Sequence, residues 1–255
     1  MATVMMEQRG NLLWLILNRP DVYHAINFQV MDELEDLIRF GNGEEKIHAI
    51  LLTGSGEKAF ASGGDVREFH SFSDEKEVID MLSRMARLLE EISASPKLTV
   101  AAINGLALGG GAEITTAFDL RAASEDARIG FIQRNLHLTT GWGGGTRLMH
   151  LFGADRAFPL LLSGKIYSAK EWHNWGYLHA LFPKEEFRER VENWVKEILP
   201  APEVLLSYKR MKNRIEGRKK WKEEIEKEVK ECAKLWMSPE HHKKVEAFLS
   251  KKKES

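Results

Sequence analysis

The stretch from Lys97 to Thr116 (KLTVAAINGLALGGGAEITT) constrains this chain more than any other. Its β-rich apolar run over Thr99 to Ile103 is typical of a strand that is buried on both faces. Gly105 and a second apolar tripeptide follow, and then the consecutive glycines 109–111 open a helical pattern. Glycine lets backbone approach a ligand closely, and the first N–H groups of a helix have no partner within it. The stretch therefore predicts a ligand site built from backbone where a strand passes into a helix.

Glu113 stands two residues after this glycine triplet. The start of a helix already favours negative charge, so a carboxylate there is unusual for a simple anion site. It suits a site where charge develops during a reaction and an acid or base must stand beside it. A carboxylate that only offsets the helix dipole is the alternative. Because glycines flank Glu113, we favour the catalytic interpretation.

An earlier stretch has the same design. His48 to Thr53 (HAILLT) predicts a buried strand, Gly54-Ser55-Gly56 a turn, and Ala59 to Val66 a run of small residues that enters a helix. Asp65 falls in the first turn of that helix, where we expect an ordinary helix cap. Each junction can offer one backbone N–H, so the two together predict an oxyanion hole with Glu113 behind the second.

Length and composition narrow the class of protein. With 255 residues the chain can form one full core, or a core with an appendage, and its formal net charge of −1 argues against a generally basic nucleic-acid binder. The single cysteine, Cys232, excludes an internal disulfide, and its charged helical surroundings indicate a structural role. No apolar run reaches about 20 residues, and no signal-peptide pattern is evident at the start. We expect a cytoplasmic protein that does not enter a membrane.

Strands alternate with helices up to about residue 199, and only helices follow. This order indicates an α/β core with a helical C-terminal module, and the boundary is expected near Leu199 to Pro202. We find no clear internal repeat. The expected elements are a hairpin over 4–17, helices after Asn27 and over Asp74 to Ser93, short strands over Asp119 to Ala123 and Arg128 to Phe131, a helix from Arg147, a turn region over Ser163 to Ala169, and helices over Ala169 to Trp175, around Phe187 to Ile198 and from Val204 onward.

Several segments together resemble the crotonase (enoyl-CoA hydratase/isomerase) superfamily. They are specific in combination and in order, and they cover nearly the whole chain. The segments are Leu17 to Pro20 with Ala25 to Asn27, Ala59 to Val66, Asn104 to Glu113, Gly141 to Leu148, and Ser238 to Lys251. The resemblance implies an α/β fold, a crotonase-like spiral of ββα repeats over 1–199 that holds an acyl-CoA site. It also implies that the helical module over 200–255 serves oligomerisation and coenzyme A contact.

The resemblance further implies a lyase or isomerase that acts on acyl-CoA thioesters. Coenzyme A is then part of the substrate, no other cofactor and no metal is expected, and the chain forms a homo-oligomer, a trimer or a dimer of trimers. The N–H groups of Gly64 and Gly110 would donate to the thioester oxygen and stabilise the enolate formed there. The residues implied in substrate or coenzyme A contact are Val22, His24, Ala61, Ser62, Gly63, Asp65, Val66, Arg67, Trp142 and Phe248, and Lys251 to Lys253 are candidates for its phosphates.

One position departs from the hydratase pattern. Glu113 matches one of the two catalytic carboxylates of the hydratases, but the position that aligns with the second is Gln133. An amide does not exchange a proton at working pH, so hydration by two carboxylates is in doubt. Glu113 could instead act alone on a water that Gln133 orients, or shuttle a proton in an isomerase. In a third hypothesis, a decarboxylase, loss of CO₂ generates the enolate without a base.

The hydratase/isomerase hypothesis stands first, with fatty acid metabolism as its setting. The alternative is a decarboxylase of methylmalonyl- or ethylmalonyl-CoA, because Leu108 to Arg121 (LGGGAEITTAFDLR) and the loop at Gly141 resemble short-chain malonyl-type decarboxylases. Another class, a non-catalytic or RNA-binding homologue, is suggested by the lysines of 209–234. Glutamates alternate with those lysines, so this segment carries mixed charge, which argues against nucleic acid as a partner.

Overall fold

The computed structural model describes residues 2–251, apart from the side chains of Arg218, Lys219 and Lys251. The strands are β1 (Val4–Arg9), β2 (Leu12–Leu17), β3 (Ala49–Gly54), β4 (Ala59–Ala61), β5 (Leu98–Ile103), β6 (Leu106–Leu108), β7 (Leu120–Ser124), β8 (Arg128–Gly130), β9 (Tyr167–Ser168) and β10 (Ala180–Phe182). The helices are α1 (Phe28–Gly43), α2 (Val66–Phe69), α3 (Glu75–Ala94), α4 (Gly110–Thr115), α5 (Gly144–Phe152), α6 (Ala154–Ser163), α7 (Ala169–Asn174), α8 (Phe187–Ile198), α9 (Pro202–Glu216), α10 (Arg218–Trp236) and α11 (Pro239–Lys251), with short 3-10 helices η1 (Pro20–Val22) and η2 (Gln133–Leu136).

The strands form two sheets, with the orders β1-β2-β3-β5-β7-β10 and β4-β6-β8-β9. Each of the successive pairs β3 and β4, β5 and β6, and β7 and β8 gives one strand to each sheet, and helices follow each pair. The chain therefore winds as a spiral of ββα turns, and the predicted fold class is confirmed. The repeat is not recognisable in the sequence because the helical parts of the turns differ in length: α3 has 20 residues and α4 has six.

The larger sheet separates two cores. Successive side chains of a strand point to opposite faces, so Leu13, Leu15 and Leu17 of β2 join the core toward α1 and α3. Leu12, Trp14 and Ile16 join a second core with residues of α8 and with Leu205 of α9. Burial on both faces explains why β2, β3 and β5 are almost continuously apolar.

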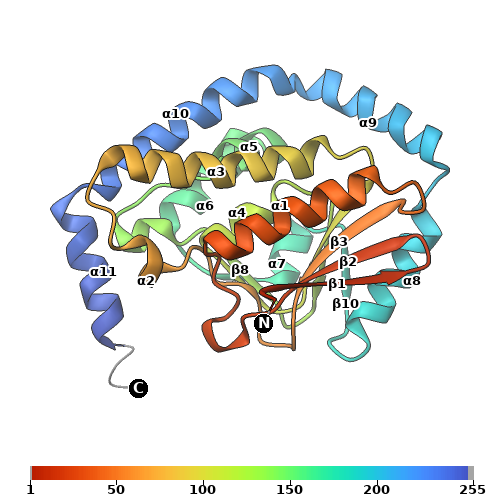
Figure 1. Cartoon of the computed structure of the whole chain (residues 1–255), viewed down its shortest axis with the longest axis horizontal. Helices are drawn as coiled ribbons and strands as arrows, with labels where there is room; N and C mark the ends of the chain where they lie inside the picture. Colours follow the sequence, from red (N-terminus) through yellow and green to blue (C-terminus); the bar gives the residue numbers. More distant parts are fainter. Residues whose placement is uncertain (1, 252–255) are drawn as a thin grey trace.

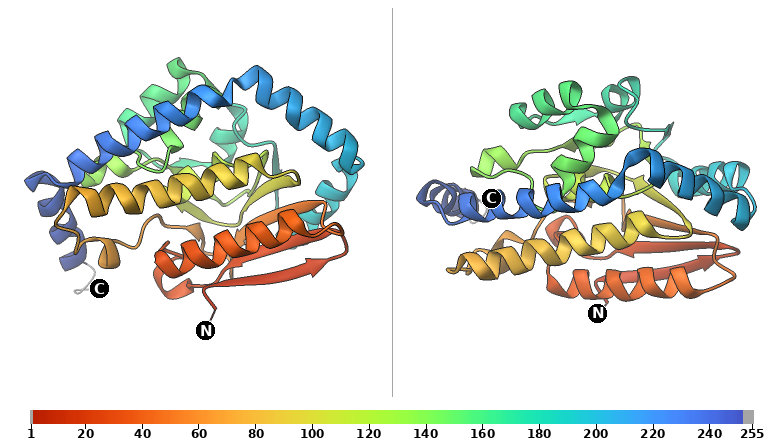
Figure 2. Two further views of the ribbon diagram at one scale, coloured as in Figure 1. Left: turned by 45° about the horizontal axis from the view of Figure 1, so that its top comes forward. Right: turned by 90° about the horizontal axis from the view of Figure 1, so that it is seen from above.

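The C-terminal helices wrap the core. In Figure 1, α9 and α10 arch over the top of the molecule and α11 descends along its left side. Figure 2 shows α10 lying between α3 and the α5–α6 pair, and α10 contacts both α3 and α5. α11 packs against η2. The predicted role of residues 200–255 in oligomerisation stays a prediction, and Lys252 and Lys253 lie outside the described residues. Within the described chain, no helix combines the length and apolar character needed to cross a membrane.

Most expected elements are present, with three corrections. The helix expected from Arg147 begins at Gly144 and is interrupted at Gly153, whose φ of +82° ends α5 and starts α6. The turn region over 163–169 contains β9, which is only two residues long. β10 was not predicted at all, because a three-residue strand carries too little pattern to be recognised.

Asn104 ties the two strand–glycine junctions together. Its Oδ1 accepts from the Gly54 N–H at 3.0 Å, and its Nδ2 donates to Gly54 O at 2.9 Å and Gly56 O at 2.8 Å. The side chain thus links the end of β5 to the turn that leads from β3 into β4.

We predict that Asn104→Ala lowers the free energy of unfolding by about 1–3 kcal/mol, because it leaves buried backbone groups without partners. Denaturant unfolding measures the change. The control is Asn18→Ala, which removes one 3.3 Å bond to Ala2 O near the surface and should change stability by less than about 0.5 kcal/mol. Equal effects of the two substitutions would contradict this role of Asn104.

Candidate active site

The peptide between Gly63 and Gly64 is fixed by Ile26. Ile26 N–H donates to Gly63 O at 2.8 Å, and Asp65 N–H donates to Ile26 O at 2.8 Å. A trans peptide places its C=O and N–H on opposite sides, so the Gly64 N–H points away from Ile26. This N–H makes no hydrogen bond to another residue of the described chain.

The peptide between Gly109 and Gly110 has the same arrangement. Gly109 O accepts from the N–H groups of Ala112 and Glu113 at 3.0 and 3.1 Å, so the Gly110 N–H points out of the start of α4. It also donates to no other residue among those described. The two junctions touch, since a Cβ built on Gly63 would lie 3.2 Å from Gly110 N. The two junctions therefore lie next to each other, and the oxyanion hole expected from them stays a prediction.

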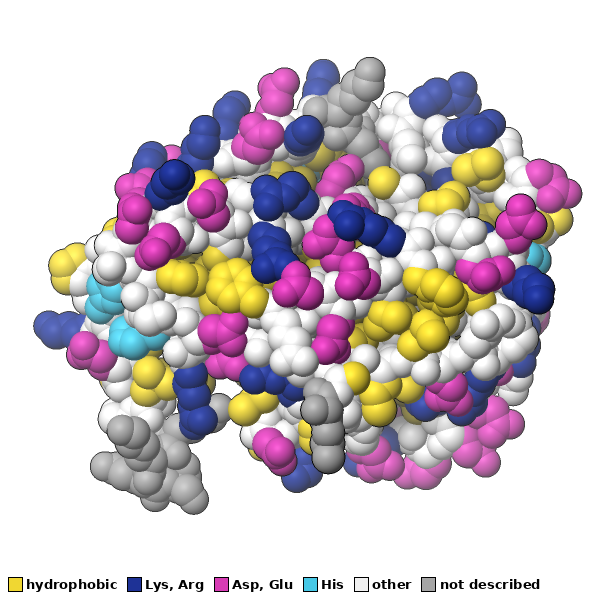
Figure 3. All heavy atoms as spheres, in the orientation of Figure 1, with side chains coloured by type: hydrophobic (Ala, Val, Ile, Leu, Met, Phe, Trp, Pro, Cys, Tyr) yellow, Lys and Arg dark blue, Asp and Glu magenta, His cyan; other side chains and the backbone are white. Residues whose placement is uncertain are grey.

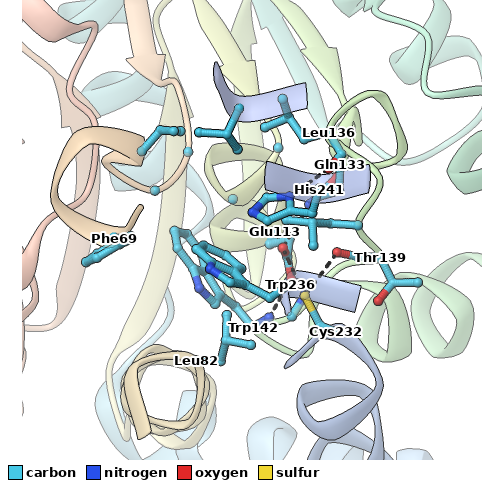
Figure 4. Close-up of a pocket in the computed structure, with 18 of the residues that line it drawn as sticks. Phe69, Leu82, Glu113, Gln133, Leu136, Thr139, Trp142, Cys232, Trp236 and His241 are labelled. Atoms are coloured by element: carbon cyan, nitrogen blue, oxygen red, sulfur yellow. Dashed lines mark hydrogen bonds between the residues drawn. The ribbon is translucent and has the colours of Figure 1, made fainter. Parts of the chain in front are cut away.

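Gly64 and Gly110 line one cavity, which Figure 4 shows in close-up. The Trp142 ring lies against both glycines: a Cβ on Gly110 would overlap it, and a Cβ on Gly64 would contact it at 3.5 Å. The cavity volume is about 120 Å³. Most of its wall is apolar and comes from α2, α3, the 132–142 segment, α10 and α11.

Glu113 is buried in this cavity and its carboxylate is held by backbone. Oε2 accepts from the N–H groups of Trp142 and Gly144 at 2.9 and 3.0 Å, and Oε1 accepts from Gln133 Nε2 at 2.8 Å. A Cβ on Gly144 would overlap the Glu113 side chain, so the loop can approach this carboxylate only with glycine at position 144. The carboxyl group is thereby fixed in position without a salt bridge.

Two opposing influences set the pKa of Glu113. Burial, followed by the charge of Glu228, disfavours the carboxylate, while the donors on Trp142, Gln133 and Gly144 favour it. Burial and charge outweigh the donors, and the pKa is raised to about 7. A carboxyl group with a pKa near neutral can both take and give a proton at working pH.

Gln133 lies at the start of η2, and it lines the cavity together with Glu113. Its Nε2 is used by Glu113, whereas its buried Oε1 has no partner among the described residues. An amide oxygen accepts two hydrogen bonds, so this atom can hold a water or a hydroxyl group. Gln133 thus belongs to the site, although it cannot exchange a proton.

The other predicted contact residues separate into two groups. Ser62, Gly63, Val66 and Trp142 line the cavity. Ala61 does not line it, but its O lies so close to Gly111 that no side chain fits at Gly111. The second group lies outside the cavity wall and consists of Val22, His24, Asp65, Arg67 and Phe248.

Each member of this second group has a different setting. Val22 O accepts from the Ser62 hydroxyl at 3.1 Å, and the buried His24 ring bridges the Arg19 N–H and Ser55 O. Asp65 caps α2 through the Arg67 N–H and pairs with Arg19 at 2.8 Å, so the expectation of a helix cap is confirmed. The side chains of Arg67 and Phe248 are exposed.

The C-terminal helices supply wall residues that the sequence did not indicate. Cys232 and Trp236 of α10 and His241 and Val245 of α11 line the cavity, together with His70 after α2. Their i, i+4 spacing on each helix is the signal that marks one buried face. Burial raises the pKa of the Cys232 thiol, which donates to Thr139 O, so this cysteine is a neutral wall residue. In the described part of the chain, no three His, Cys, Asp or Glu side chains form a metal site.

Comparison with known proteins agrees with this fold and site. A family model described as "Enoyl-CoA hydratase/isomerase" matches residues 7–255. The chain is 31% identical over 198 residues to "Crotonyl-CoA hydratase" of Syntrophomonas wolfei, covering 77% of this chain and 75% of that one. It is 31% identical over 194 residues to "Ethylmalonyl-CoA decarboxylase" of Xenopus tropicalis, covering 74% and 63%.

A solved structure shows the same architecture. The enoyl-CoA hydratase of Bacillus halodurans superposes with a TM-score of 0.88 at 27% identity, covering 96% of this chain and 99% of that one. By fold, the protein is therefore a crotonase-type enzyme. With the family match over residues 7–255, the chain belongs to the enoyl-CoA hydratase/isomerase family.

We predict that Glu113 titrates with a midpoint near pH 7, carrying its proton below and losing it above, because burial and Glu228 disfavour the charged form. Carbon-13 NMR of glutamate-labelled protein measures this, and the resonance that disappears in Glu113→Gln identifies the group. A midpoint near the ordinary value of 4.5 would contradict the assignment.

Proposed function

We propose that the protein is a short-chain enoyl-CoA hydratase that uses Glu113 as its one proton-exchanging carboxyl group. The observation that carries this proposal is the position of Glu113, with a pKa near 7, in the cavity that the Gly64 and Gly110 amides also line. In this proposal those two N–H groups donate to the thioester oxygen. Removing one such donor typically costs about 10²–10³ in rate.

The proposed reaction adds water across the C2–C3 double bond. Glu113 as carboxylate takes a proton from the water, whose oxygen bonds to C3. The electron pair of the double bond moves to C2 and the carbonyl, which gives an enolate that the two amides stabilise. Glu113 then returns the proton to C2. Each step uses a group already fixed in the site, so little reorganisation is needed.

Gln133 would hold the attacking water. In a two-carboxylate site, both carboxylates accept hydrogen bonds from the water. Here the unpartnered Oε1 of Gln133 can accept one water proton while Glu113 accepts the other. Because Gln133 Nε2 donates to Glu113, the amide also fixes the distance between the two acceptors.

The size of the cavity supports a short acyl chain. An apolar cavity of about 150 Å³ is large enough for benzene, with its six carbon atoms. The cavity here, about 120 Å³, suits a chain of about four or five non-hydrogen atoms. Trp142 and Trp236 both contribute large rings to the cavity wall, which supports a short chain.

Decarboxylation is the second candidate, and Gln133 is the observation that favours it. A malonyl-type thioester carries its own carboxylate, and a second glutamate at position 133 would repel it. Loss of CO₂ leaves the same enolate on the same two amides, and protonated Glu113 would supply the proton to C2. The similarity to the Xenopus tropicalis protein named as a decarboxylase is consistent with this alternative.

A side-by-side assay separates the two candidates. Purified protein is given but-2-enoyl-CoA, and separately methylmalonyl- and ethylmalonyl-CoA, and the products are identified by mass. Hydration adds one water to the first thioester, whereas decarboxylation removes CO₂ from the others. Turnover of the malonyl-type thioesters alone would replace the hydratase proposal by the decarboxylase.

We predict that Glu113→Gln lowers turnover more than about tenfold while thioester binding survives, because the acid/base group is lost but the donors remain. Stopped-flow assays and calorimetry measure the two quantities. Glu192→Gln is the matched control. Glu192 is also a buried carboxylate, but it lies on α8, away from the cavity, and pairs with Arg9 of β1 and Lys196 of α8. An unchanged rate in Glu113→Gln would remove this residue from the mechanism.

We predict that Gln133→Glu retains or raises hydration of but-2-enoyl-CoA, because a second carboxylate beside Glu113 can also exchange a proton. Gln29→Glu is the control, since Gln29 makes the same amide-to-carboxylate bond with Glu33 at the surface, at 2.9 Å. A loss of hydration by more than about tenfold would instead indicate that the neutral amide is needed.

We further propose a cytoplasmic homo-oligomer, a trimer or dimer of trimers, with acyl-CoA thioesters as its ligands. Large apolar side chains exposed on α6 and α9, among them Leu162 and Ile215, support a covered surface. On the face shown in Figure 3, basic and acidic side chains are interspersed, which supports the absence of a nucleic-acid partner. Analytical ultracentrifugation tests the assembly, and a monomer at micromolar concentration would overturn it.

A further inference from the structure

Three residues that line the cavity each have a buried polar atom with no partner among the described residues. These atoms are Trp236 Nε1, His70 Nδ1 and Gln133 Oε1. Buried polar groups are nearly always hydrogen-bonded, and an unpartnered one indicates a water or ligand that completes it. The proposed hydration accounts for Gln133 Oε1 but uses neither Trp236 nor His70.

Trp236 restricts the chemistry of that ligand. The indole nitrogen is a donor and never an acceptor, so its complement must be an acceptor atom. Val66, Phe69 and Leu82 make much of the cavity wall apolar. In such a pocket, a polar group such as the Trp236 N–H fixes the orientation of the ligand. A hydrocarbon chain would leave the Trp236 N–H buried without a partner.

One histidine lies beside Trp236 where α11 meets the rest of the site, and two more histidines lie next to it. The His241 ring lies 4.9 Å from the Trp236 ring, and its Nδ1 is held by Leu136 O at 2.7 Å. The centroid of the His242 ring lies 5.7 Å from that of His241 and 6.0 Å from that of His70. Burial lowers the pKa of His241, and its neutral ring donates its one N–H to Leu136 O, so His241 adds no donor to the cavity. His70 Nδ1, which has no partner among the described residues, can donate in one tautomer and is the second donor available to an oxygen acceptor.

We propose that the acyl chain bound in this cavity carries an oxygen acceptor, a carboxylate or a carbonyl, which the Trp236 N–H recognises. The inference rests on the proposed function only in taking the cavity as the acyl site. Trp236 is then the residue that distinguishes a polar acyl group from a hydrocarbon one. Rejection of the hydrocarbon follows because a buried donor left without its acceptor weakens binding strongly.

Binding of freshly prepared saturated thioesters, which lack the double bond that is hydrated, tests this proposal independently of turnover. Calorimetry compares butanoyl-CoA with butanedioyl-CoA, which adds a terminal carboxylate, and pentanoyl-CoA with 4-oxopentanoyl-CoA, which adds a neutral carbonyl. We expect at least one oxygen-bearing thioester to bind about tenfold or more tightly than its hydrocarbon counterpart. The pair that shows the preference identifies the acceptor as charged or neutral.

Trp236→Phe should abolish that preference, because the ring remains but the N–H is lost. Trp221→Phe is the matched control: it makes the same change on the same helix, where Trp221 stacks on His150 outside the cavity, and it should leave the preference unchanged. Equal binding of both members of each pair to the wild-type protein would overturn the proposal, even if hydration is observed. If Trp236→Phe still prefers the oxygen-bearing thioester, Trp236 does not recognise the oxygen and the proposal is wrong. If the wild-type protein shows the preference but no turnover, only the proposed function is contradicted.

Discussion

The proposed chemistry of this protein depends on the orientation of two peptide groups, which leaves the N–H groups of Gly64 and Gly110 free, within the described chain, to bind a ligand. At Gly63–Gly64 and at Gly109–Gly110 the carbonyl accepts from neighbouring backbone, so each N–H points away from that backbone, and Gly64 and Gly110 both line the cavity. Backbone N–H groups are seldom left without a partner in folded proteins, and in the described part of this structure two such groups belong to junctions that touch each other. The two junctions meet because successive turns of the spiral place β4 and β6 side by side in the smaller sheet.

The acid/base group depends on a third segment of chain. Glu113 is anchored by the N–H groups at the start of α5, and Glu228 of α10 accepts from the next two, those of Gly145 and Thr146. Two carboxylates from different helices therefore share one glycine-rich loop. Their proximity explains why the charge of Glu228 contributes to the raised pKa of Glu113. The C-terminal helices thus influence the chemistry as well as enclosing the cavity.

The parts of the site that were predictable from the sequence are local. The strand–glycine–helix pattern indicated the two junctions and Glu113, because the need for glycine at such a junction depends on only a few neighbouring residues. Gly64 and Gly110 as the individual donors followed from the resemblance. The contact between Glu113 and Gln133 followed only from the resemblance, since 20 residues separate them. Trp236 and His241 were missed because their place in the wall depends on how α10 and α11 fold back over the core. A helical period shows which face is buried, but not what it is buried against.

Infrared spectroscopy of a bound thioester tests the central claim most directly. Butanoyl-CoA labelled with carbon-13 at its carbonyl carbon gives a C=O stretch that can be followed in difference spectra with and without protein. If the Gly64 and Gly110 amides both donate to the carbonyl oxygen, the stretch moves to clearly lower frequency on binding, because the C=O bond is polarised toward the enolate. A bound thioester whose carbonyl frequency equals that in water would contradict the account.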